Sequence, residues 1–192
     1  GRELGGRGDI LQNIRRIGGE CHGCGGDDGG GRPGWEVVLC GLDGVLQKGA
    51  AHARAKNVEE AVYLHWRLAP DMLPLTRQVQ FATEIPARAL SPLADVAVPS
   101  FPDTETTFEA LRARVARARD HIRGLPSATM DADPDKEIRV PAGREERTFT
   151  RINFLQHYIL PNLYFHTTTT YLILRHLGVE IGKLDFLAAP PR

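Results

Sequence analysis

The chain has 192 residues, and its 24 Lys and Arg balance 24 Asp and Glu, so the formal net charge at pH 7 is zero. This balance argues against a general electrostatic attraction to nucleic acid or to an anionic membrane, and no run of about 18 apolar residues predicts a membrane-spanning helix. Three cysteines are too few for a disulfide framework, so we expect a cytoplasmic protein that binds neither nucleic acid nor membrane.

Composition divides the chain into a tail and one domain. Residues 1–34 contain most of the 20 glycines, and a segment so rich in glycine buries too little apolar surface to offset its chain entropy. We therefore expect 1–34 to be a disordered tail. The domain is predicted over 35–188, where apolar residues recur at regular spacing.

Three amphipathic helices are predicted in the first part of this domain. The first covers 35–55, where apolar residues recur at helical spacing from Trp35 onward, although three glycines weaken it. The second lies within 71–93 and carries its apolar stripe at Leu75, Val79, Ala82 and Ile85. A proline-rich connection then leads to the third.

The third helix is predicted to follow a capping box formed by Thr106 and Glu109. Its apolar side begins at Phe108 and continues through Leu111. Five arginines lie at other positions around the helix. A group of arginines can bind phosphate, but a solvated helix face is the more common explanation. We interpret Arg114 and its neighbours as such a face.

A β-hairpin and a long final helix complete the predicted domain. Residues 137–150 alternate in polarity around a glycine-containing turn, which favours a hairpin. Thr150 is expected to cap a last helix that ends at Gly178 and bends near Pro161. Four amphipathic helices predict an all-α, up-and-down four-helix bundle with a small β-hairpin before the last helix.

Polar residues on the apolar faces of two helices mark a candidate site. On the last helix, Asn162 and His166 are one turn apart and share a face with Thr169 and Thr170. On the second helix, Gln78 lies beside the apolar stripe. We therefore expect a pocket between these two helices, lined by Gln78, Asn162, His166, Thr169 and Thr170.

Two explanations of these residues remain open. His166, Asn162 and Gln78 could hold a weakly bound divalent metal or a polar small molecule, with the neutral imidazole as the best donor. Alternatively, the amides, the imidazole and the threonine hydroxyls could satisfy one another in a buried hydrogen-bond network. Two amides and one imidazole form a poor zinc site, so the chemistry alone favours the network.

Three segments resemble a known family. "RLAPDMLPLTRQVQ" (67–80), "PSFPDTETTFEAL" (99–111) and "LPNLYFHTTTTYLILRHLGVEIGKLDF" (160–186) are similar to a domain-of-unknown-function family in the DinB/YfiT-like superfamily. The resemblance covers about residues 39–187. It implies a four-helix bundle, commonly a homodimer, and a relationship to metal-dependent hydrolases and thiol S-transferases.

The resemblance also implies where a metal would bind. The superfamily commonly uses one histidine from the second helix and a His-x-x-x-His pair from the last helix. His166 matches the second histidine of the pair, whereas Asn162 replaces the first and Gln78 falls near the second-helix position. The sequence thus supports two hypotheses: a diverged metal- or small-molecule-binding enzyme, or a non-catalytic dimeric bundle whose inward polar residues are structural.

Overall fold

The structure is a computed structural model, and it describes residues 34–126, 133, 135–142 and 145–188. The predicted disordered tail therefore lies outside the described residues, except for Gly34, which begins the first helix. All the other described residues belong to the domain predicted over 35–188.

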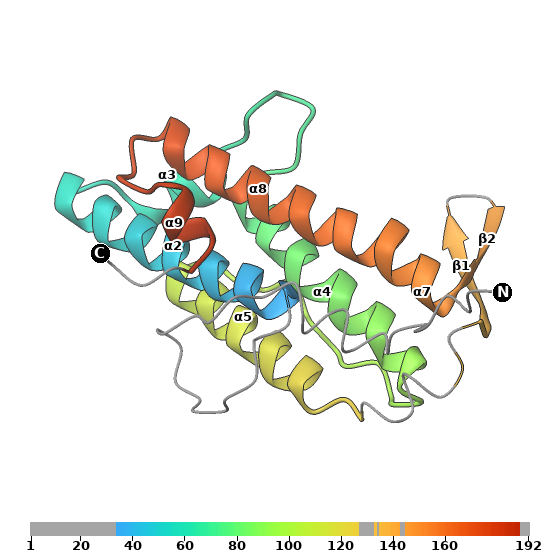
Figure 1. Cartoon of the computed structure of the whole chain (residues 1–192). Coiled ribbons are helices and arrows are strands. Elements are labelled where there is room, and N and C mark those ends of the chain that lie inside the picture. The colour runs from blue at the N-terminus through green and yellow to red at the C-terminus, as the bar shows by residue number, and fades with distance from the viewer. Residues whose placement is uncertain (1–33, 127–132, 134, 143–144, 189–192) are drawn as a thin grey trace, which may run out of the picture.

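The protein is mostly helical, with one small hairpin, as predicted (Figure 1). The main helices are α2 (Gly34–Lys56), α4 (Leu75–Leu93), α5 (Phe108–Arg123) and α8 (Leu160–His176), and the short ones are α3 (Glu60–Leu64), α7 (Arg151–Phe154) and α9 (Lys183–Phe186). Strands β1 (Glu137–Ala142) and β2 (Glu145–Thr150) pair antiparallel, with Glu137 opposite Thr150. A π-helical turn, η1 (Leu155–Ile159), joins α7 to α8. None of the described helices combines the length and the apolar character needed to cross a membrane.

The direction of one helix differs from a simple up-and-down order. The start of α4 lies beside the residues that precede α5, since Gln80 is hydrogen-bonded to Glu105, and the end of α4 lies beside the end of α5, since Ser91 is hydrogen-bonded to His121. Helices α4 and α5 therefore run parallel. The segment 94–107 returns along the length of the bundle to connect them (Figure 1), which the spacing of apolar residues alone does not indicate.

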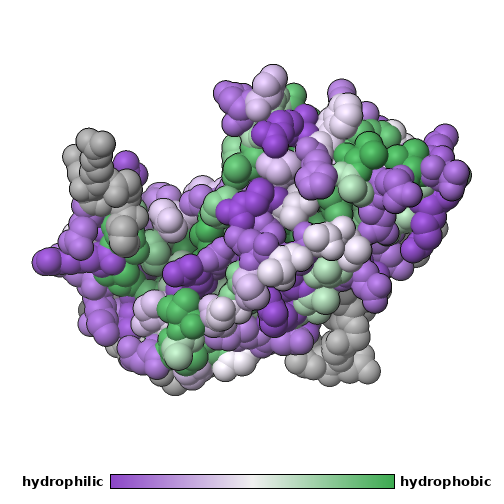
Figure 2. Space-filling view, turned by 180° about the vertical axis from the view of Figure 1, so that it is seen from behind, coloured by the Kyte–Doolittle hydropathy of each residue, from purple (hydrophilic) through white to green (hydrophobic). Residues whose placement is uncertain are grey.

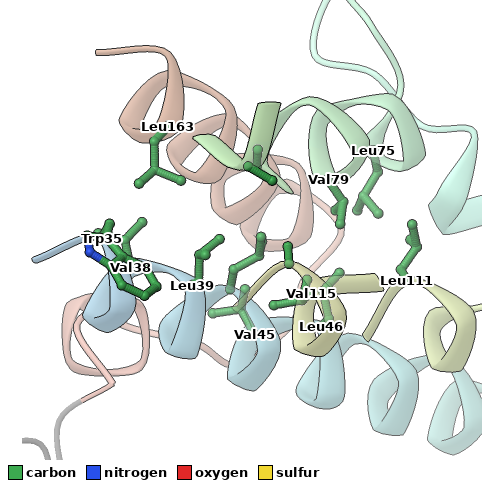
Figure 3. Close-up of a cluster of buried hydrophobic side chains, with 14 of the residues drawn as sticks. Trp35, Val38, Leu39, Val45, Leu46, Leu75, Val79, Leu111, Val115 and Leu163 are labelled. Carbon is green, nitrogen blue, oxygen red and sulfur yellow. The ribbon is translucent and has the colours of Figure 1, made fainter. Parts of the chain in front are cut away.

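A single apolar core lies among α2, α4, α5 and α8 (Figure 3). Each helix contributes side chains from one face, and most of those that the helical spacing predicted are buried, whereas Ile85 of α4 is only half-buried. The labelled core residues are Trp35, Val38, Leu39, Val45 and Leu46 from α2, Leu75 and Val79 from α4, Leu111 and Val115 from α5, and Leu163 from α8. This core fixes α4 against α8, the two helices that carry the candidate site.

Two glycines have structural roles. The sequence did not indicate the role of Gly41, but it predicted that of Gly178. A Cβ at Gly41 would overlap the carbonyl oxygen of Phe186, so this position allows α9 to pack directly against α2. Gly178 has a φ of 86°, the left-handed conformation expected after the end of α8. The prediction that Gly178 ends the last helix is thereby confirmed.

The cap of α5 is one residue away from the predicted one. Thr107, not Thr106, is the N-cap, and its hydroxyl accepts a hydrogen bond from the Ala110 amide at 3.1 Å. The Phe108 amide is bonded to a carboxylate from α3, Glu60, at 2.8 Å. Two successive threonines make the register ambiguous in sequence, and the packing of Phe108 in the core selects the second of them.

The interpretation of Arg114 as part of a solvated face is wrong. Its side chain is 0% exposed and lies 3.0 Å from Glu105 and 3.1 Å from Asp103, which both belong to the segment 94–107. Its Nε donates to the Thr83 hydroxyl at 2.9 Å. Arg114 is buried because the returning segment covers this side of α5 and supplies carboxylates there.

Candidate functional site

The helical turn before α8 is irregular because of Pro161. Pro161 has no amide hydrogen to donate to the carbonyl of residue 157, and its ring is crowded against that carbonyl in a regular α-helix. The chain accommodates it with the π-helical turn at Leu155–Ile159. The side-chain amide of Asn162 then donates to the Tyr158 carbonyl at 2.7 Å. The predicted bend near Pro161 thus takes the form of a widened turn.

The four threonines after His166 are mostly buried and bond to their own helix. Thr167, Thr169 and Thr170 are buried, whereas Thr168 is exposed. The Thr170 hydroxyl donates to the His166 carbonyl at 2.9 Å, and Thr169 donates to the Phe165 carbonyl at 2.8 Å. These bonds satisfy the hydroxyls within the helix. The hydroxyls of Thr169 and Thr170 are therefore bonded to backbone carbonyls of α8, and neither is bonded to the imidazole.

The structure brings Gln78 and His166 together, as the sequence predicted. His166 Nδ1 lies 2.8 Å from Gln78 Oε1, across the contact between α8 and α4. The amide nitrogen of Gln78 donates to the Leu73 carbonyl at 3.1 Å, so the amide oxygen must be the atom that faces the imidazole. Because Oε1 can only accept, Nδ1 carries the proton and Nε2 carries the lone pair.

Two aromatic rings enclose the imidazole. Phe81 stacks on His166 with ring centroids 5.3 Å apart, and Phe165 approaches edge-on with centroids 5.2 Å apart. The side chain is only 8% exposed. Burial lowers the pKa of His166 below its usual range, because the charged form loses its hydration. His166 is consequently a neutral imidazole at pH 7.

The second ring nitrogen of His166 is available to a ligand. No described residue is hydrogen-bonded to Nε2, and His166 is not among the residues with a buried, unpartnered polar atom. The lone pair of Nε2 therefore keeps contact with solvent. A hydrogen-bonded Nδ1 that orients a free Nε2 is the arrangement found at histidines that bind metals or accept protons.

Asn162 lies on the same helix as His166, and one part of its side-chain amide is bonded within the helix. Its amide nitrogen bonds to the π-helical turn, and no described residue donates to its Oδ1. It is half-buried, and it lies one helical turn before His166, where Cβ atoms are about 5–6 Å apart. Thr169 and Thr170 complete the predicted set, and both are buried on α8.

The donor set near His166 does not match a tight metal site. Within the described part of the chain, no three His, Cys, Asp or Glu side chains are grouped so that they could hold one ion. The available donors are one imidazole nitrogen and one amide oxygen, and zinc prefers imidazole, thiolate and carboxylate. The site can hold a divalent ion only weakly, or a ligand that supplies hydrogen-bond donors.

Sequence reasoning missed two residues that shape the site. Phe81 stacks on the imidazole, and the guanidinium of Arg77 lies 4.8 Å from the centre of the Phe81 ring. Phe81 is three residues after Gln78 and so shares its helix face, a signal that the spacing contained. Arg77 is four residues before Phe81, so the same spacing places it beside that ring, whereas its ion pair with Asp103 depends on the segment 94–107.

The outer surface of the molecule is mainly hydrophilic on one face. Figure 2, which views the molecule from behind, shows hydrophobic side chains scattered over this face. The segment 65–74 rises beside α8 in Figure 1. Leu73, whose carbonyl holds Gln78, belongs to this segment.

Comparisons with known proteins agree with the architecture. The model of a family described as a domain of unknown function, DUF1993, matches residues 35–187. The crystal structure of a DinB family member protein from Shewanella denitrificans is similar to this chain, with a TM-score of 0.74 and 36% sequence identity over 82% of this chain and 89% of that chain. A comparison with curated proteins gives no match.

Proposed function

Because the chain belongs to the DUF1993 family within the DinB-like superfamily, we propose that it binds a small molecule or a weakly held divalent metal between α4 and α8. His166 is the central residue of this site. The observation that carries the proposal is the neutral imidazole with Nδ1 bonded to Gln78 and Nε2 free.

The polar atoms left free at the site define the chemistry of the ligand. Nε2 of His166 and Oδ1 of Asn162 are both acceptors, and no described residue donates to either. A ligand that supplies N–H or O–H groups, or a cation, can be held by these lone pairs. The proposed site suits an ammonium, an amide or a hydroxyl group, and among metals it suits those that accept imidazole and amide ligands.

A catalytic role for His166 would be that of a general base. A neutral imidazole with an oriented Nδ1–H can accept a proton at Nε2 from a bound hydroxyl, thiol or water. The Gln78 oxygen would then face the Nδ1–H of the imidazolium, and this hydrogen bond stabilises the charged form less than a carboxylate does. The arrangement favours a weak base that works near neutral pH.

A calorimetric titration with Ni²⁺ and Zn²⁺ tests the metal-binding form of this proposal. We expect weak binding of one ion per chain, lost in His166→Gln. His157→Gln is the matched control, because His157 lies in the preceding π-helical turn, nine residues before His166, and is exposed. Binding that survives His166→Gln would contradict the metal form. For the small-molecule form, ethanolamine and acetamide are titrated against ¹⁵N-labelled protein, and amide shifts around His166 are expected only in the wild type.

A second function is favoured by the outer face of α8. Pro161, Phe165, Thr168 and Leu172 are exposed and recur at spacings of four, three and four residues, which is the spacing of a helix–helix seam. Phe165 is 57% and Leu172 45% exposed. The seam carries no charge, so two copies can pair without repulsion. We propose a homodimer through this face, in which the inward polar residues are structural.

The two proposals are separable. Leu172→Glu is expected to convert a dimer to a monomer in light scattering coupled to gel filtration, because it places a charge on the exposed seam away from the Phe165 ring that approaches His166. Thr168→Glu places a charge in the middle of the same seam without removing an aromatic ring. A wild-type protein that is monomeric at high concentration would overturn the dimer proposal and leave the ligand site unaffected.

A further inference from the structure

Arg77 connects the His166 site to the segment 94–107. Its guanidinium lies 4.8 Å from the centre of the Phe81 ring, and Phe81 is the residue that stacks on His166. The same guanidinium is paired with Asp103 and donates to Gln80 at 2.7 Å. One cation thus contacts an aromatic ring of the site and a carboxylate of the returning segment.

The carboxylate partner of Arg77 is itself held from the interior. Asp103 uses one oxygen for Arg77 and places the other 3.1 Å from Arg114. Glu105 repeats this arrangement, with one oxygen 3.0 Å from Arg114 and the other accepting from Gln80 at 2.8 Å. Both carboxylates therefore bridge α5 to α4, and the buried Arg114 gives Asp103 little freedom to move.

We propose that Arg77 and Asp103 are positioning residues for His166, acting through Phe81. The ion pair holds the guanidinium over the Phe81 ring, Phe81 holds the plane of the imidazole, and the plane of the imidazole sets the direction of Nε2. The purpose of this positioning rests on the proposed function, in which Nε2 receives the ligand. The positioning itself is a property of the ligand-free protein and can be tested without a ligand.

The physical basis is the restriction of a half-buried ring. Phe81 is not fully enclosed by the core, so packing alone leaves it room to move. A guanidinium over an aromatic face is attracted by the ring quadrupole, and hydrogen bonds at Gln80 and Asp103 keep that guanidinium in place. Removing Arg77 should loosen the Phe81 ring and with it the plane of the imidazole.

Nuclear magnetic resonance of the histidine ring protons tests the proposal in the full chain without ligand. The His166 signals are identified by their absence in His166→Gln. In Arg77→Gln, we expect the His166 ring protons to shift, because the ring current of Phe81 changes. Asp103→Asn should shift the same protons in the same direction by a smaller amount. Arg77→Lys should reverse only part of the ring-proton shift, because a lysine stacks less well.

Arg88→Gln is the matched control. Arg88 is an exposed arginine on the same helix, paired with Glu84 at 2.7 Å rather than with Asp103, so its loss removes the same charge without touching Phe81. Phe81→Leu verifies that the assay responds to the ring. His166 signals that are unchanged in both Arg77→Gln and Asp103→Asn would overturn the proposal, as would an equal change in Arg88→Gln.

Discussion

Replacing Gln78 by methionine tests the hydrogen bond on which the candidate site depends. Methionine is close to glutamine in length, so the change removes polarity while nearly preserving volume. It deletes the bond between Gln78 Oε1 and His166 Nδ1, and the bond from the Gln78 amide to the Leu73 carbonyl. A typical hydrogen bond contributes about 0.5–1.5 kcal/mol net, and an orphaned buried group costs about 1–3 kcal/mol.

The imidazole can avoid part of this cost. If the proton moves from Nδ1 to Nε2, which keeps contact with solvent, the orphaned donor is hydrated and only an unpaired acceptor remains inside. We therefore expect Gln78→Met to lower the free energy of unfolding by about 1–3 kcal/mol in total. At about 2–4 °C per kcal/mol for a chain of this length, the melting temperature should fall measurably.

Two measurements follow this change. Urea denaturation gives the free energy of unfolding, and long-range ¹H–¹⁵N spectra report which ring nitrogen of His166 carries the proton. The wild type should show the Nδ1–H form and Gln78→Met a shift toward Nε2–H. Gln47→Met is the control, because Gln47 is exposed on α2 and undergoes the same chemical change. A wild-type His166 protonated at Nε2 would refute the reasoning, and so would a Gln78→Met protein as stable as the control.

Three further predictions concern the same helices. Burial lowers the pKa of His166, so below about pH 6.5 the unfolded chain binds a proton that the folded chain does not. The free energy of unfolding should therefore fall as the pH drops below about 6.5, by at most about 1.4 kcal/mol per pH unit. In urea titrations at several pH values, His166→Gln should reduce this slope. Arg114→Met should destabilise by about 3–5 kcal/mol, with partial recovery when Glu105→Gln is added; a loss below about 1 kcal/mol would contradict the buried network. Asn162→His should bind Ni²⁺ more tightly than the wild type in calorimetry, and unchanged affinity would mean that residues 162 and 166 do not share a ligand.

Helical spacing predicted the apolar faces because burial of one face depends mainly on the residues of that helix. The stripe from Phe108 to Ile122 on α5 is buried as expected, and Thr150 caps the final helical segment by accepting from the Asn153 amide. These features are local, and the residues that determine them lie within a few positions of one another. The same is true of the hairpin, which pairs as predicted.

Features that depend on distant segments could not be predicted in this way. The sequence predicted a solvated face of α5 for Arg114, because a group of arginines on a helix is normally solvated. The structure buries it because Asp103 and Glu105 arrive from the returning segment. The parallel direction of α4 and α5 has the same origin, since apolar periodicity does not say on which end of a helix a long connection finishes.

The candidate site shows a second limit of prediction from sequence, which concerns single atoms rather than residues. Sequence placed an amide, an imidazole and threonines on facing helices, but it could not say which atom of each is already bonded. The structure shows that several donors are already bonded internally: Gln78 donates to Leu73, His166 Nδ1–H faces Gln78, and Thr170 donates to its own helix.

The acceptor atoms of the site have a consequence for the ligand. No described residue donates to Nε2 of His166 or to Oδ1 of Asn162. A cation or a hydroxyl group can bind to these lone pairs, whereas a free phosphate would find only the second N–H of each side-chain amide. Imidazole nitrogen and amide oxygen both donate lone pairs to metals, but zinc prefers imidazole, thiolate and carboxylate. The proposed site therefore suits electron-poor ligands, and a metal ion bound there would be held weakly.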